Sequence, residues 1–277
     1  MSGPGSRCTD WEIFPVRLGS RLRRRRPLAV ILGGRPPPLG GTMTTPSRRL
    51  WQLAGVFALA HVVLIPVGIY LQDSPLFADG TAGITESYVE GDITRSFVGG
   101  VLESFGFLLM VPVLVFLGRV LGRRGEAGGW AAETGLLCGM GYVAVTFAVG
   151  FPAGAAAMYG AQQGLDVDTA FALNNVRIFG YFLSLLLLGG STLGFAAAAL
   201  MDGLHRRWFG WFGVVTAVAL LASTPLAGIG QQDWGTLVWM VWFVGVAVLM
   251  IRHREDQPGD PGITATRGPD RASLTSR

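Results

Sequence analysis

The chain has 277 residues, of which half are apolar and 14% are charged, and its mean hydropathy is +0.45. A soluble domain carries about 25% charged residues, so this composition excludes an ordinary soluble fold and indicates a polytopic membrane protein. The formal net charge is +4. Every basic residue apart from histidine is arginine, and 11 of the 22 arginines lie in the connections that flank the long apolar segments. We therefore interpret the positive charge as a membrane-topology signal and expect no nucleic-acid partner.

Residues 1–42 form a basic, proline-rich leader that includes LRRRRPLAVILGGRPPPLGG. Its apolar run, LAVIL, is shorter than the 7–15 apolar residues of a signal peptide, so we expect a disordered leader. Met43 opens MTTPSRRLWQLAG, which is typical of the start of an inner-membrane protein. We expect the true start at Met43; mass spectrometry of the native protein would show an N-terminus at Met43 or Thr44, and an intact leader would contradict this.

Six apolar segments follow, each close to the ~20 residues that cross a ~30 Å hydrocarbon layer. We expect crossings at about 51–70, 97–118, 131–150, 178–200, 208–229 and 234–251, and the start of the fourth is open between Thr169 and Tyr181. The predicted fold class is therefore all-α: one domain of six transmembrane helices over residues 43–251. Residues 252–277 form a polar tail that we expect to be disordered.

Arginine alternates between the connections of this six-helix scheme. Counted from Met43, the arginine-rich connections contain Arg48 and Arg49; Arg119, Arg123 and Arg124; Arg206 and Arg207; and Arg252 and Arg254. The opposite connections contain only Arg95 and Arg177. Short arginine-rich loops stay in the cytoplasm, so we predict that both termini are cytoplasmic. The lack of lysine beside abundant alanine, glycine and proline suggests a GC-rich bacterial genome, and hence the bacterial cytoplasmic membrane.

A few polar groups lie within or beside the predicted crossings. Glu103 is the one ionisable residue of segment 97–118 and lies ~9 Å below the outer boundary; His61 lies ~15 Å from the inner boundary, so the two differ in height by roughly one helical turn. The other candidates for the same polar pocket are Arg177, Asn174, Asn175, Tyr142 and Tyr181. Ionisable groups at this depth are costly and normally face the bundle interior or water.

Two interpretations of these residues remain open. In the functional one they form an outward-facing pocket in which Glu103 takes a proton or a cationic group. In the structural one Arg177 neutralises Glu103, His61 bonds to a backbone carbonyl or a hydroxyl group, and the cluster fixes helix register.

Small residues at four-residue spacing recur in the apolar segments, as at Gly135/Gly139 and Gly190/Gly194. This spacing lets helices approach closely, and helix packing is its simplest interpretation. No HExxH, GxSxG or P-loop motif is present, and Cys8 and Cys138 lie too far apart in sequence to suggest a metal-ligand pair. We therefore expect no cofactor or metal and name no catalytic residue. We favour a protein that is not an enzyme, and an enzyme stays open only through a chemistry outside these motifs.

The segments GDITRSFVGGVLESFGFLLMVPVLVFLGR, WAAETGLLCGMGYVAVTFAVGFPAGAAAMYGA and TLVWMVWFVGVAVLM resemble a group of uncharacterised bacterial six-helix membrane proteins of the domain-of-unknown-function type. The resemblance covers about Met43 to Ile251. It implies the six-helix fold and adds no catalytic residue.

Three functions remain under consideration, with the lipid bilayer as the common partner and a homo-oligomer or membrane partner protein left open. The first is small-molecule or proton-coupled transport or sensing, which a water-accessible cavity containing Glu103 and His61 would favour. The second is a structural or accessory subunit of a membrane complex, favoured by a tight Glu103–Arg177 pair and a flat apolar flank. The third is an enzyme acting on a lipid or isoprenoid, favoured by an open lateral groove beside Glu103.

Overall fold

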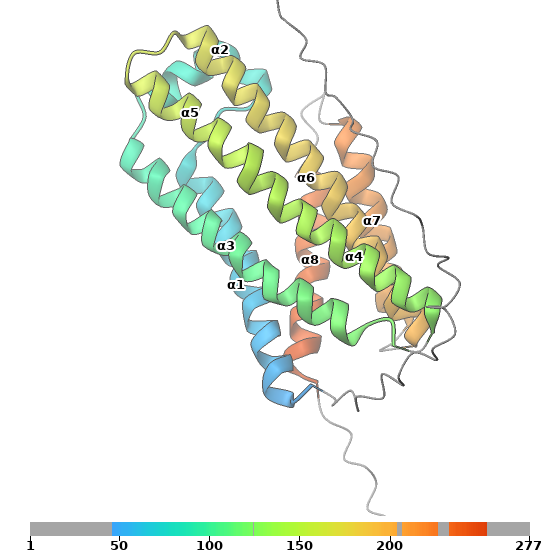
Figure 1. Ribbon diagram of the computed structural model, residues 1–277. Coiled ribbons are helices and arrows are strands. Elements are labelled where there is room, and N and C mark those ends of the chain that lie inside the picture. The colour runs from blue at the N-terminus through green and yellow to red at the C-terminus, as the bar shows by residue number, and fades with distance from the viewer. Residues whose placement is uncertain (1–45, 124, 204–206, 227–232, 254–277) are drawn as a thin grey trace, which may run out of the picture. The chain divides into compact units, whose positions relative to one another are not determined.

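The computed structural model describes residues 46–123, 125–203, 207–226 and 233–253 and is built of helices (Figure 1). The expected leader at residues 1–42 lies outside the described residues, as do residues 254–277 of the expected tail. The helical elements are α1 (Arg48–Gln72), η2 (Phe77–Asp79), α2 (Gly80–Ile84), η3 (Thr85–Val89), α3 (Ile93–Val120), α4 (Glu126–Val145), η4 (Thr146–Gly150), α5 (Phe151–Gln162), α6 (Val167–Asp202), α7 (Arg207–Leu226) and α8 (Asp233–Ile251).

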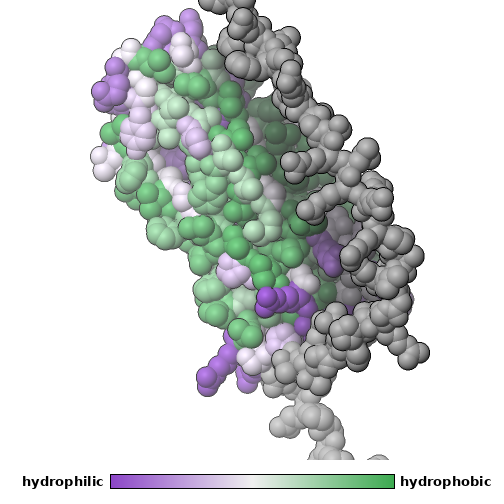
Figure 2. Space-filling model, in the orientation of Figure 1, coloured by the Kyte–Doolittle hydropathy of each residue, from purple (hydrophilic) through white to green (hydrophobic). Residues whose placement is uncertain are grey.

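Six helical stretches are long and apolar enough to cross a membrane, which confirms the expected all-helical architecture. They are residues 48–89, 93–120, 126–162, 167–202, 207–226 and 233–251, and each expected crossing overlaps one of them. The space-filling view shows a mainly hydrophobic surface along the bundle with hydrophilic residues gathered towards its ends (Figure 2). These features suggest a multi-pass membrane protein.

The helices extend beyond the segments that hydropathy marks. Residues 151–162 continue the third stretch as α5 because FPAGAAAMYGAQ is rich in alanine, which has the highest helix propensity. The wide π-helical turn of η4 lies between α4 and α5, and Pro152, whose nitrogen cannot donate, stands in the first turn after it. The fourth stretch begins at Val167, where the side chain of Asp166 accepts a hydrogen bond from the Thr169 amide at 3.2 Å.

Two pairs of helices form most of the bundle: α1 packs on α3, and α4 packs on α6. Both contacts depend on glycine. A Cβ atom on Gly99 of α3 would lie 2.6 Å from the carbonyl oxygen of Gly68 of α1, and one on Gly194 of α6 would lie 2.6 Å from the amide nitrogen of Gly135 of α4. The backbones of each pair therefore touch, as glycine-lined membrane interfaces allow.

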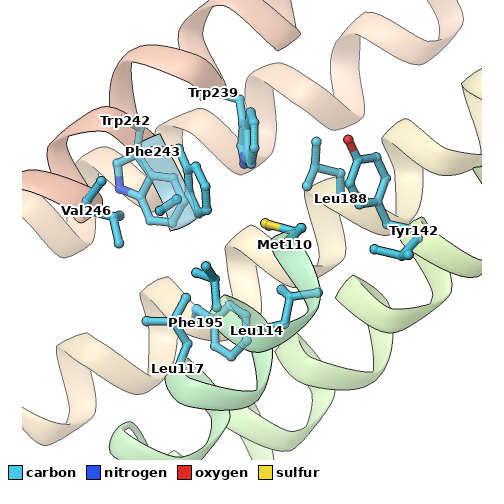
Figure 3. Close-up of a cluster of buried hydrophobic side chains, with 14 of the residues drawn as sticks. Met110, Leu114, Leu117, Tyr142, Leu188, Phe195, Trp239, Trp242, Phe243 and Val246 are labelled. Carbon is cyan, nitrogen blue, oxygen red and sulfur yellow. The ribbon is translucent and has the colours of Figure 1, made fainter. Parts of the chain in front are cut away.

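The helices α7 and α8 complete the bundle. α7 packs on α6 and α8, and α8 packs back on α1. The buried apolar core brings together Trp239, Trp242 and Phe243 of α8 with Met110 and Leu114 of α3, as Figure 3 shows. We call the end of the bundle where α1 begins and α8 finishes the arginine end, because Arg48, Arg119, Arg207 and Arg252 lie in its terminal turns and connections; the opposite end, which includes α2, is the cap end.

Candidate functional site

A cavity of about 730 Å³ occupies the half of the bundle nearer the cap end. It forms because α3 packs against α4 but makes at most weak contact with α5, which leaves space between the two helix pairs. Its walls come from α1, α3, the α4–α5 stretch, α6 and α8. Of the residues expected to form a polar pocket, those that line it are Glu103, His61, Arg177, Tyr142 and Tyr181, whereas Asn174 and Asn175 lie outside its lining.

Glu103 is placed by the close contact between α1 and α3. A Cβ atom on Gly68 would lie 2.8 Å from the Cβ atom of Glu103, so this residue stands directly beside α1. Helical side chains lean towards the helix N-terminus, and the two helices run in opposite directions, so Gln72 and Glu103 lean towards each other. The Gln72 side-chain amide donates a hydrogen bond to Oε2 of Glu103.

Arg177 binds neighbours other than the expected carboxylate. Its Nε donates to Oδ1 of Asn174 at 2.8 Å, and its Nη2 donates to the Pro75 carbonyl oxygen at 2.8 Å. Within the described part of the chain it forms no ion pair with Glu103. The guanidinium group therefore links the connection after α1 to α6.

Asn174 is a structural residue beside the mouth of the cavity. It is fully buried, its Oδ1 accepts a hydrogen bond from the Tyr88 hydroxyl at 3.0 Å, and its Nδ2 donates to the Pro75 carbonyl at 3.1 Å. Asn175, one residue later, is half-buried, and its Oδ1 is enclosed with no hydrogen-bond partner among the described residues. Asn174 is therefore hydrogen-bonded through both polar atoms of its side chain, whereas the side-chain oxygen of Asn175 is not hydrogen-bonded to any described residue.

His61 lies at the deep end of the cavity, in contact with the aromatic core. Its Nδ1 lies 2.8 Å from the Gly106 carbonyl oxygen, and since a carbonyl only accepts, Nδ1 carries the proton. Its ring meets those of Phe107 and Trp239 edge to face, with centroids 6.0 and 5.8 Å away. Its Nε2, the remaining acceptor, has no hydrogen-bond partner in the described ranges. This bond to a backbone carbonyl is the one that the structural interpretation of the cluster expected for His61.

The two tyrosines stand on facing walls. Tyr142 of α4 is 6% exposed, its ring lies 5.2 Å from that of Phe107, and its hydroxyl group has no hydrogen-bond partner within the residues that the structure describes. Tyr181 of α6 has its hydroxyl 3.2 Å from Oγ1 of Thr236 on α8. Figure 3 shows the Tyr142 hydroxyl pointing away from its own helix beside Leu188.

Sequence reasoning missed several polar residues of the cavity, and four of them bear most on its chemistry: Gln72, Asp73, Thr236 and Asp233. All lie in terminal turns of α1 or α8, where polar residues normally mark the membrane boundary. The available signal was that Gly68 and Gln72 on α1, like Gly99 and Glu103 on α3, stand one turn apart. A glycine contact between such helices brings the two polar side chains together.

Comparisons with models of protein families, with curated proteins and with solved structures found no match. Among the described residues, no group of three or more His, Cys, Asp or Glu side chains is placed to hold a metal ion. The site is therefore characterised by its own geometry: a mainly apolar chamber with a carboxylate on its wall and a tyrosine hydroxyl and an imidazole nitrogen at its deep end.

Proposed function

We propose that the protein is a multi-pass membrane protein that binds a small molecule in this cavity, as a transporter or a sensor. One observation carries the proposal: Glu103, the Tyr142 hydroxyl and Nε2 of His61 all border a single large cavity deep in an apolar bundle. Among the described residues, neither the Tyr142 hydroxyl nor Nε2 of His61 has a hydrogen-bond partner, so both are available to a ligand. Mainly apolar cavities of this size with a few convergent polar groups are typical ligand sites.

The contacts of Arg177 favour this function over a purely structural role for the cluster. A structural role would use Arg177 to neutralise Glu103 directly, but the guanidinium group donates to Asn174 and Pro75 instead. Glu103 therefore keeps a carboxylate that is open to the cavity, with one amide donor from Gln72.

The cavity lies in the cap half, remote from the arginine end. Because arginine-rich connections stay in the cytoplasm, this arrangement supports a mouth on the outer side of a bacterial cytoplasmic membrane, with both termini inside. The same orientation makes Glu103 accessible to external ligands or protons.

Thiol labelling tests whether the cavity is open to water. Ser184 lines the cavity and Ser191 lies two turns further along α6; each is 2% exposed, but Ser191 borders only a separate void of about 10 Å³. In a background without Cys8 and Cys138, Ser184→Cys should react much faster than Ser191→Cys with a membrane-impermeant thiol reagent added outside intact cells. Equally slow reaction of both would overturn the proposal.

A further inference from the structure

We infer that the ligand of this cavity is an organic cation with an apolar body and at least one N–H donor; this inference rests on the proposed function. The charges on the walls give the first reason. The cavity is lined by the carboxylates of Asp73, Glu103 and Asp233 and by one guanidinium group, that of Arg177. Acidic residues therefore outnumber basic ones on the walls, and the N–H groups of Arg177 that bind Asn174 and Pro75 are not available to a ligand.

The positions of the carboxylates give the second reason. Asp73, which ends α1, and Asp233, which begins α8, are both exposed at the cap end. Glu103 lies level with Gly68, five residues before Asp73 on α1, which places it roughly 7 Å further in by helix rise. Acidic groups thus stand at the mouth and again on the inner wall, where they attract a cation inward.

The hydrogen-bonding capacity of the deep end gives the third reason, and it is independent of formal charge. Because Nδ1 of His61 donates to the Gly106 carbonyl, Nε2 presents a lone pair to the cavity. The Glu103 carboxylate also accepts, and the Tyr142 hydroxyl can do either. His61 and Tyr142 are each more than nine-tenths buried. A ligand that satisfies these acceptors must donate, as an ammonium or amidinium group does.

The remaining wall suits the apolar body of such a ligand. Rings of Phe107, Phe151 and Trp239 border the cavity beside Tyr142 and Tyr181. The faces of aromatic rings attract cations and also pack against hydrocarbon. A carboxylate ligand of the same shape would meet acceptors and negative charge and would be rejected.

Three molecules with the same adamantane cage test the inference: 1-adamantylammonium, neutral 1-adamantanol and 1-adamantanecarboxylate. The readout is the protection of Ser184→Cys, in purified full-length protein without its native cysteines, against a small neutral maleimide. We expect the ammonium compound to protect best, the alcohol weakly and the carboxylate not at all. Glu103→Gln removes the negative charge but keeps an acceptor, so it should weaken protection by the ammonium compound about tenfold, as expected when a hydrogen bond to a charged group becomes a neutral one.

Two control variants show whether the loss of protection in Glu103→Gln is specific to the charge at this position. Glu133→Gln makes the same substitution at an exposed position in the first turns of α4 and should leave protection unchanged. Glu103→Asp keeps the charge and should retain most of it, and the three-compound comparison stands even if Glu103→Gln fails to fold.

The outcomes separate the two claims. Three outcomes would overturn the cation inference and leave an accessible cavity. The first is equal or better protection by the carboxylate, and the second is no protection by any compound while Ser184→Cys still reacts faster than Ser191→Cys. The third is unchanged protection in a folded Glu103→Gln protein. A Ser184→Cys thiol as unreactive as Ser191→Cys would overturn the proposed function itself.

Discussion

At the scale of single residues, the adjacent asparagines of α6 show how differently two identical side chains can contribute. Asn174 joins Tyr88, Pro75 and Arg177 through three hydrogen bonds, whereas the Oδ1 of Asn175 is enclosed with no partner among the described residues. Removing a partner from a buried network is costly, but removing an unsatisfied group is not.

The first prediction follows from this contrast. Asn174→Leu should lower the free energy of unfolding by ~3 kcal/mol, because it strands the Tyr88 hydroxyl and one donor of Arg177. Asn175→Leu should leave stability unchanged or raise it slightly. Unfolding by SDS from mixed micelles measures both, and equal losses in the two variants would contradict this account of the cap end.

The second prediction concerns the carboxylate on the cavity wall. Glu103→Ala and Gln72→Ala each remove one partner of the same hydrogen bond, so their effects on unfolding free energy should be coupled by about 0.5 kcal/mol or more. Glu103→Gln and Arg177→Gln should be additive within about 0.5 kcal/mol, since the two side chains share no direct contact. Full rescue of Glu103→Gln by Arg177→Gln would instead establish them as a structural pair.

At the scale of helices, the contact of α3 with α1 depends on Gly99 and not on the adjacent Gly100. A Cβ atom on Gly99 would press on the backbone of α1 at 2.6 Å, whereas the nearest atom to one on Gly100 would be 3.9 Å away. Backbone atoms cannot yield without moving the helix, so the two positions respond differently to the same added methyl group.

The third prediction compares these two positions. Gly99→Ala should destabilise the protein by about 1–3 kcal/mol, the usual cost of overpacking a close interface. Gly100→Ala should be neutral or stabilising by up to about 1 kcal/mol, because alanine is the better helix former. The same SDS titration measures both variants, and a well-tolerated Gly99→Ala would show that the helices are not in backbone contact.

At this scale the sequence predicts the existence of the helices better than their ends. Apolar runs of about 20 residues are a strong signal, and all six appear as helical stretches. Residues 151–162 lie outside the expected crossings, in a stretch interpreted as a weakly polar connection, yet helix continues through the wide turn of η4. Helix propensities of single residues do not predict a π-helical turn such as η4, next to which a proline can stand within a continuous helix.

The candidate site shows the same division. The sequence identifies Glu103 and His61 because polar groups in an apolar segment are visible without any structure. It does not identify their partners, since Gln72 and the Gly106 carbonyl come from a neighbouring helix whose distance and register depend on tertiary packing. The favoured partner of Glu103, Arg177, was inferred from charge alone, and charge does not specify which acceptor lies within reach.

At the scale of the whole molecule, the arrangement of the two ends gives the fourth prediction. Gly164 has a φ of 86° and stands exposed in the turn between α5 and α6, at the cap end. Alkaline phosphatase inserted there should be active outside the cytoplasm, because the opposite end contains the arginine-rich connections. Green fluorescent protein fused after the last residue should fluoresce inside the cell. The reverse pattern would place the mouth of the cavity in the cytoplasm.

The last helix of the bundle, α8, packs against the first, α1. A Cβ atom on Gly55 of α1 would lie 2.6 Å from the Ile251 side chain, and the Trp51 ring stacks on that of His253 with centroids 4.1 Å apart. The other end of α8 contributes Asp233, Thr236 and Trp239 to the cavity.

This closure determines the order of events during biosynthesis. Of these helices, α1 is synthesised first and α8 last, so α1 cannot pack against α8 until all the intervening helices have been inserted into the membrane. Until then the deep end of the cavity lacks the wall against which the His61 ring rests. Chains truncated before α8 therefore lack the wall that Asp233, Thr236 and Trp239 form, and the proposed binding of a ligand requires the completed molecule.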